Sequence, residues 1–381
     1  MGIQVPPPLA LYIHIPWCVR KCPYCDFNSH ALRGDIPEAA YLQALRRDLE
    51  SALPSVWGRP ITSIFIGGGT PSLLSAGALD ALLTQVRTLL PVRPGAEVTL
   101  EANPGTFEAA RFKAYRAAGI NRLSIGVQSF DSAKLIALGR IHDGREARAA
   151  VEVARGLFDN LNLDLMYALP GQDMLELRAD LDAAIGFAPE HLSVYHLTLE
   201  PNTAFASAPP PLPDDDLAAD MHEWLEMRLA EAGYDHYETS AYARPERYCR
   251  HNLNYWQYGD YLGIGAGAHS KLTSAGGVQR QARVKHPNDY LAHSGTPLAL
   301  AEERQVGRAD LAFEFMMNAL RLNSGFDPAL FTERTGLPIT QIEARLVRAV
   351  ELGLLERDLH AIRPTGRGQR FLNELLGLFL D

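Results

Sequence analysis

The chain has 381 residues, of which 47% are hydrophobic, so it can bury a large core and form two or three domains or one large α/β barrel with an extension. Its formal net charge of −9 disfavours broad contact with a nucleic-acid backbone, which needs clustered Lys and Arg. No apolar run approaches the ~20 residues that span a bilayer, and no basic segment followed by an apolar one opens the sequence, so we expect a cytoplasmic protein.

Strand and helix patterns alternate through the first 200 residues or so. A short lead with three consecutive prolines precedes the first predicted strand, and a cysteine-rich loop follows it. Six strand-then-helix units imply parallel pairing with right-handed crossovers, which favours a partial (β/α)6 barrel over an open doubly wound sheet. The predicted strands are residues 11–15, 61–66, 97–101, 122–127, 161–166 and 191–197, and the predicted helices are 37–53, 73–90, 107–118, 132–138, 144–157 and 175–187.

The rest of the chain has a different composition. An exposed loop at 204–216, a helix at 217–232 and a short strand at 234–239 are followed by 241–282, which is dense in Tyr, Gly and His and lacks periodicity. The C-terminal pattern predicts a mainly helical, winged-helix-like module. Its predicted elements are a long helix at 302–322, helices at 327–335 and 339–352, a strand pair at 354–363 and a final helix at 366–380. The predicted domains are a core barrel over 1–235, an irregular connecting region over 236–300 and the C-terminal module over 301–381.

The C-terminal module raises the question of DNA binding, because winged helices often bind DNA. Acidic residues are interleaved with its arginines, so we expect no nucleic-acid partner and favour packing against the barrel or another protein.

Three of the four cysteines lie directly after the first predicted strand. Cys18, Cys22 and Cys25 have C-x3-C-x2-C spacing, unlike a disulfide framework, and fit a reducing compartment. Three thiolates at this spacing can hold three irons of a [4Fe–4S] cluster, which leaves the fourth iron free to bind a substrate or cofactor. A structural zinc site is the alternative. Its fourth ligand would be His14, His30 or Cys249.

Polar groups also follow the later strands. Residues 67–71, Gly-Gly-Gly-Thr-Pro, expose backbone groups that can bind an amino or carboxylate group of a ligand. In β/α barrels the active site lies at the C-terminal ends of the strands. Arg140, beyond the fourth strand, can meet a carboxylate, although a surface arginine is the simpler interpretation. The polar residues at the predicted strand ends are Glu101, Gln128, Asp164 and His196, any one of which could also be a satisfied core group.

These motifs resemble the radical S-adenosylmethionine (SAM) superfamily. The segments 12–16, 124–130 and 164–170 narrow the resemblance to the branch of oxygen-independent coproporphyrinogen III oxidase (HemN) and the haem chaperone HemW. It implies that Cys18, Cys22 and Cys25 hold the cluster, whose open iron chelates SAM for one-electron cleavage to a 5′-deoxyadenosyl radical. The SAM contacts that it implies are Tyr12, Tyr24, Gly68, Gly69, Thr70, Glu101, Gln128, Arg140 and Asp164.

Two departures separate the chain from the oxidase. The oxidase branch carries a further cysteine where this chain has Phe27. The oxidase also has a longer segment before the tyrosine of its first strand, whereas in this chain only eleven residues precede Tyr12. Both departures favour the haem-chaperone branch. The resemblance therefore implies a protein that binds a [4Fe–4S] cluster, SAM and haem and delivers haem to acceptors such as respiratory proteins. The alternative is a radical enzyme acting on a porphyrin, such as coproporphyrinogen III oxidase.

A third feature indicates the haem site. Residues 251–256 contain the H-N-x-x-Y-W pattern of the chaperone branch, in which His251 is a natural axial ligand and Tyr255 and Trp256 can pack on a porphyrin. The alternative is an aromatic core segment with a hydrogen-bonded histidine. The glycines of 263–269 would let the backbone approach a flat ligand. The expected partners are haem-accepting proteins, some of them membrane-bound and contacted peripherally, and an electron donor for the cluster.

Overall fold

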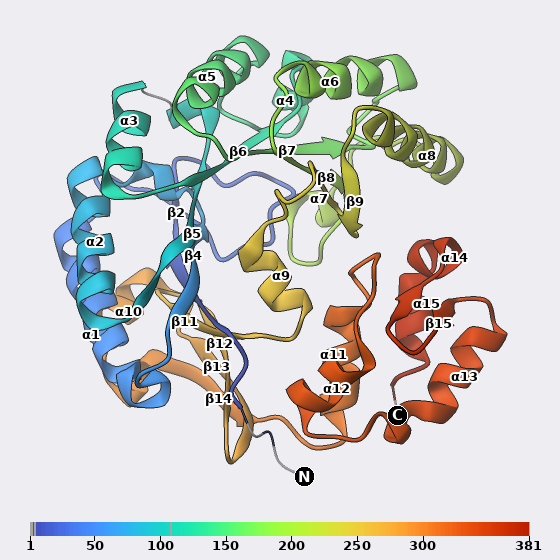
Figure 1. The fold of residues 1–381 in the computed structure, drawn as a ribbon. Coiled ribbons are helices and arrows are strands. Elements are labelled where there is room, and N and C mark those ends of the chain that lie inside the picture. Colours follow the sequence, from blue (N-terminus) through green and yellow to red (C-terminus); the bar gives the residue numbers. More distant parts are fainter. Residues whose placement is uncertain (1–2, 4, 107–108, 381) are drawn as a thin grey trace.

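A curved sheet organises the fold, with helices on its outer side (Figure 1). The computed structural model describes residues 3, 5–106 and 109–380, and within this part the main sheet has twelve strands. Its centre is a parallel series in the order β1-β4-β5-β6-β7-β8, which confirms the partial six-stranded barrel. These strands are β1 (Leu9–Ile15), β4 (Ile61–Gly68), β5 (Val92–Ala102), β6 (Arg122–Gln128), β7 (Leu161–Tyr167) and β8 (His191–His196).

The outer helices match the predicted ones to within a few residues. Ser75, Asp131, Asp143 and Asp173 accept hydrogen bonds from backbone N–H groups in the first turns, which explains where four of the helices begin. The predicted start of the third helix, at residue 107, lies outside the described residues. The helices are α1 (Glu38–Val56), α2 (Ala76–Leu89), α3 (Ala109–Ala118), α4 (Ser132–Ala137), α5 (Gly144–Leu157), α6 (Met174–Gly186), the short α7 (Ala204–Ser207) and α8 (Asp215–Glu231).

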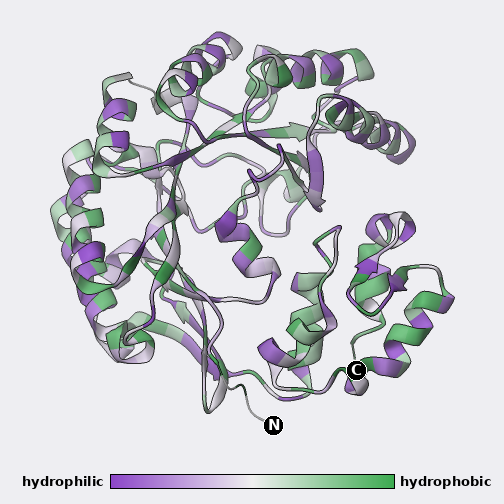
Figure 2. Cartoon of the chain, in the orientation of Figure 1, coloured by the Kyte–Doolittle hydropathy of each residue, from purple (hydrophilic) through white to green (hydrophobic). Residues whose placement is uncertain are grey.

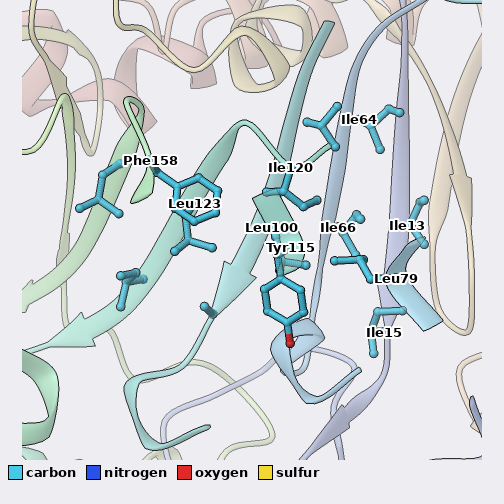
Figure 3. Close-up of a cluster of buried hydrophobic side chains, with 14 of the residues drawn as sticks. Ile13, Ile15, Ile64, Ile66, Leu79, Leu100, Tyr115, Ile120, Leu123 and Phe158 are labelled. Carbon is cyan, nitrogen blue, oxygen red and sulfur yellow. The ribbon is translucent and has the colours of Figure 1, made fainter. Parts of the chain in front are cut away.

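Alternation along the strands separates the core from the barrel lumen. Ile13, Ile64, Leu100 and Leu123 are fully buried in one apolar cluster between sheet and helices (Figure 3). On each strand, the residues immediately before and after these buried ones face the lumen, because successive side chains of a strand point to opposite faces. The main core therefore lies outside the sheet.

Two predictions after residue 235 are wrong. The region 241–282, predicted to be irregular, contains β10 (Ala241–Ala243), α9 (Arg250–Trp256), β11 (Asp260–Ile264), β12 (His269–Ser274) and β13 (Gly277–Arg283). The predicted long helix begins instead with β14 (Leu300–Gln305), and only α11 (Asp310–Ala319) is helical. Long-range pairing explains both, since β11 extends the sheet parallel to β1 and β14 pairs with β13.

The C-terminal module follows the predicted order of helices and a strand pair, although its final helix is divided at Phe371. Its apolar cluster also includes Tyr258 and Val278, so it packs against the extended sheet. In the part of the chain that the structure describes, no helix is long and apolar enough to cross a membrane, and the outer helices all carry hydrophilic residues (Figure 2). The module contains α11, α12 (Pro328–Thr335), α13 (Glu343–Glu351), β15 (Leu355–Arg357), β16 (Ile362–Pro364), α14 (Gly366–Arg370) and α15 (Leu372–Gly377).

Candidate functional site

One cavity of about 440 Å³ begins at the cysteine loop and continues into the barrel lumen. It brings together most of the residues that the sequence predicted, although they come from segments far apart in the chain. The predicted residues in its wall are Cys18, Cys22, Cys25, Tyr24, Gly68, Gly69, Thr70, Glu101, Gln128, Arg140, Asp164 and His196. Tyr12 does not line it: its hydroxyl lies 3.0 Å from Nδ1 of His14, and its ring stacks on Phe65.

Asn28 anchors the cysteine loop to the segments that follow β11 and β13. Its side-chain amide donates to the backbone carbonyl oxygens of Ala266 (2.9 Å) and Lys285 (3.0 Å). Its backbone carbonyl oxygen lies 2.8 Å from Nε2 of His14. A Cβ atom at Gly267 would collide with this amide, and one at Gly263 would collide with the backbone of His269. The glycines of 263–269 therefore allow close packing within the protein, which accounts for them without the flat ligand that the sequence suggested.

The three free thiols have surroundings that fit a cluster. Cys18 accepts a hydrogen bond from the Thr70 hydroxyl (3.4 Å between Oγ1 and Sγ), and Cys22 accepts one from Arg140 (3.7 Å between Nη1 and Sγ). A Cβ atom at Gly69 would lie 3.1 Å from the Cys18 sulfur and 2.5 Å from the Trp17 carbonyl oxygen, so only glycine leaves this space open. Hydrogen bonds to sulfur and a nearby cation are the groups that tune an iron–sulfur cluster.

Among the described residues, no group of three His, Cys, Asp or Glu side chains could hold a single metal ion. A cluster binds its cysteines through separate irons, so its ligands need not meet at one point. The cysteine set therefore fits a cluster in its chemistry.

The glycine loop is joined to the next strand by a carboxylate. Gly68 has a φ of +119°, and a Cβ atom there would lie 2.7 Å from the His14 ring, so the position requires glycine. Its N–H donates to Oε2 of Glu101 (3.1 Å). Burial and the neighbouring Asp164 raise the pKa of Glu101 to about 8. In the ligand-free protein near neutral pH, Glu101 is therefore mostly protonated.

Gln128 and Arg140 line the cavity at the end of β6, the strand next to β5, and in the segment beyond it. Gln128 ends β6 with a φ of +69°, a conformation that non-glycine residues adopt mainly where the surrounding structure imposes it. The Arg140 guanidinium donates to the Gly126 carbonyl oxygen (2.8 Å), while its buried Nε has no partner among the described residues. This spare donor beside Cys22 suits a carboxylate on a ligand of the cluster.

Helix α9, which lies inside the curve of the sheet, carries the predicted haem residues (Figure 1). His251 is 2% exposed, its Nδ1 lies 3.0 Å from the Ser63 hydroxyl, and burial lowers its pKa to about 3. Its Nε2 has no partner in the described part of the chain, so the ring is a neutral histidine with a spare nitrogen. Tyr255 packs on Tyr261, and Trp256 packs beneath the Arg321 guanidinium. His251, Tyr255 and Trp256 lie outside the cavity wall.

The sequence prediction missed several polar residues deeper in the cavity. They alternate with apolar residues along β6, β7 and β8, and this alternation is visible in Arg-Leu-Ser-Ile-Gly-Val-Gln. Purely buried parallel strands are apolar on both faces, so the pattern signals a polar lumen. On these strands the missed residues are Arg122, Ser124, Asn162 and Ser193, and Asn252 on α9 is missed as well.

Several known proteins are similar to this chain over nearly its whole length. Residues 12–184 match the model of the radical SAM superfamily, and residues 306–371 match the HemN C-terminal domain. A heme chaperone HemW from Escherichia coli is 50% identical over 98% of both chains, and one from Bacillus subtilis is 34% identical over 97% of this chain and 99% of its own. The solved structure of coproporphyrinogen III oxidase (HemN) from Escherichia coli has a TM-score of 0.83 and 24% identity, covering 98% of this chain and 90% of its own. That structural likeness shows the fold alone.

Proposed function

The chain belongs to the HemW family of the radical SAM superfamily, and from this membership we propose that it binds a [4Fe–4S] cluster, SAM and haem and delivers haem to acceptor proteins. The observation that carries the proposal is the cavity that joins the three cysteines to the polar lumen-facing residues of β5, β6 and β7. Its setting is the cytoplasm, with respiratory proteins as the expected acceptors and a separate electron donor for the cluster.

Cys18, Cys22 and Cys25 would hold the cluster, which supplies one-electron chemistry when it is reduced. Around it, this chain would position SAM: Arg140 would bind the methionine carboxylate, and Tyr24 would pack on the adenine. The remaining assigned contacts are Tyr12, Gly68, Gly69, Thr70, Glu101, Gln128 and Asp164. Of these, Tyr12 would act through its neighbours, because it does not line the cavity and stacks on Phe65, which does.

The haem assignment rests on the chemistry of α9. His251 is neutral and keeps Nε2 free, as an axial ligand requires. Because the side chain is buried, haem would reach it only when α9 moves away from β4, and Tyr255 and Trp256 would then be exposed with it.

The decisive experiment is an anaerobic haem titration of the reconstituted chain, followed by transfer to apomyoglobin. Wild type should bind haem and release it to the acceptor, while His251→Gln, which can keep a hydrogen bond to Ser63, should bind at least tenfold more weakly. The matched control is His191→Gln, which changes another fully buried barrel histidine and should leave haem affinity unchanged. Equal affinity of wild type and His251→Gln would remove His251 as the ligand.

The porphyrin-oxidase alternative is tested in the same preparation. Coproporphyrinogen III, a reductant and SAM are added, and the products are separated by chromatography. We expect no protoporphyrinogen, since Phe27, 60% exposed at the cavity wall, stands where the oxidase branch has a further cysteine. Protoporphyrinogen formed over many turnovers would contradict the chaperone proposal and show that the chain is a porphyrin oxidase.

A further inference from the structure

The cavity extends well beyond the groups assigned to the cluster and SAM. Arg122, Ser124, Gly126 and Gln128 alternate along the whole of β6, and all four line the cavity. At about 3.3 Å per residue, the first and last of these positions are separated by roughly 20 Å. Of the proposed SAM contacts, Gln128 ends β6, while Glu101 and Asp164 pair in register with Ser124 and Gly126. Arg122 therefore lies beyond these positions, at the inner end of the strand.

Arg122 is an arginine without a partner at this inner end. Its side chain is buried, with 2% of the residue exposed, and it makes no hydrogen bond or ion pair with any described residue. A guanidinium has five N–H donors, and a buried charge is normally paired and hydrogen-bonded. The cavity that Arg122 lines is the place from which a partner can come.

The nearest carboxylates of the chain are occupied elsewhere. Glu97 accepts hydrogen bonds from the backbone N–H groups of Arg250 (3.3 Å) and His251 (3.1 Å) and from the Cys249 thiol (3.6 Å). Asp164, in turn, accepts from the side chains of its strand neighbours at 2.8 and 3.1 Å. Burial alone would lower the pKa of Arg122, but the nearby acidic side chains, Cys249 and Glu97 first, raise the pKa overall, so the guanidinium stays charged.

Asn252 is a second polar residue of the cavity wall, one residue after His251, whose N–H donates to Glu97, a neighbour of Arg122. Asn252 follows His251 on α9, yet it lines the cavity while His251 does not. We propose that Arg122 and Asn252 form a carboxylate-binding subsite at the inner end of the lumen. A guanidinium fork matches the two oxygens of a carboxylate, and the Asn252 amide adds a further donor.

This subsite goes beyond the proposed function, because the carboxylate of SAM is assigned to Arg140 at the other end. The carboxylate can come from a propionate arm of a tetrapyrrole or from a small organic acid. Both present the same group to Arg122.

Equilibrium dialysis of the full-length, anaerobically purified chain against radiolabelled propionate, at constant ionic strength with chloride, tests the subsite. Wild type should bind propionate saturably, Arg122→Gln at least tenfold more weakly, and Arg122→Lys, which keeps the charge but loses the fork, to an intermediate degree. Arg20→Gln is the control, since Arg20 lines the same cavity from the exposed cysteine loop. Asn252→Asp, which places a carboxylate at the subsite with little change of volume, should also lose at least tenfold.

Unsaturable binding by wild type, or equal affinity of wild type and both Arg122 variants, would overturn the proposal. Haem and haem dimethyl ester then distinguish the two sources of the carboxylate. If Arg122→Gln weakens haem but not the ester, the partner is a propionate arm; if it weakens only propionate, the partner is a small acid. Wild type that binds propionate but no haem would contradict the proposed function and leave the subsite standing.

Discussion

At the residue scale, Glu101 should make stability depend on pH. Its pKa is raised to about 8 in the fold, by burial and then by Asp164, against an ordinary value of 4.5. Between these values the folded state keeps a proton that the unfolded state has lost. The stabilisation is therefore complete below pH 4.5 and is lost as the pH rises towards 8. Glu101→Gln should remove this dependence. The free energy of unfolding of the variant minus that of wild type should therefore increase by up to about 1.4 kcal/mol for each pH unit between these values.

Urea unfolding of the ligand-free proteins at pH 5, 6, 7 and 8 measures this difference. Glu343→Gln is the control: a hydrogen bond from Arg357 lowers the pKa of the half-exposed Glu343, so the carboxylate is mostly ionised in both states over this range. Its effect should not vary with pH. A Glu101→Gln curve parallel to that of wild type would contradict a protonated Glu101.

At the element scale, Glu97 holds α9 inside the barrel. Its two carboxylate oxygens accept from two N–H groups in the first turn of the helix and from the Cys249 thiol. Glu97→Ala would leave these buried donors without an acceptor, which costs about 1–3 kcal/mol. We expect amide hydrogen exchange to accelerate in 250–256 more than in β5 itself.

Glu303→Ala, on the exposed strand β14, is the control and should change neither stability nor exchange of α9. Unchanged exchange in Glu97→Ala would show that packing alone holds the helix.

The elements that the sequence predicted well are those fixed by local pattern. The alternation of Leu-Ser-Ile-Gly-Val and the helix-capping aspartates need only neighbouring residues to be recognised. Strand β14 could not be predicted, because Glu302, Glu303 and Arg304 favour a helix until β13 offers a partner. The mouth of the cavity was predictable, since parallel strands end together. Arg122 was not recognised as a site residue, because it begins its strand and its missing partner appears only in three dimensions.

At the scale of the whole molecule, a partly buried ion pair joins the C-terminal module to the extended sheet. Glu314 on α11 accepts hydrogen bonds from the Tyr258 hydroxyl (2.8 Å) and from Nε and Nη2 of Arg280 on β13 (3.1 and 2.7 Å). Glu314→Ala leaves a partly buried guanidinium without its carboxylate. Losing one partner of a fully buried pair costs about 3–5 kcal/mol, and this pair, which is partly exposed, should lose less. We therefore expect a markedly lower midpoint in thermal unfolding.

The outcome of this substitution also tests whether the site depends on the module. Neither Glu314 nor Arg280 lines the cavity, so iron and SAM bound per folded chain should equal those of wild type at low temperature. Arg348→Ala is the control, because its pair with Glu351 is exposed and such pairs contribute only about 0–1 kcal/mol. Replacing both partners, as in Arg280→Met with Glu314→Leu, should recover much of the loss, since no charge is then left buried alone. Lost cofactor binding in a folded Glu314→Ala chain would mean instead that the C-terminal module controls the cavity from a distance.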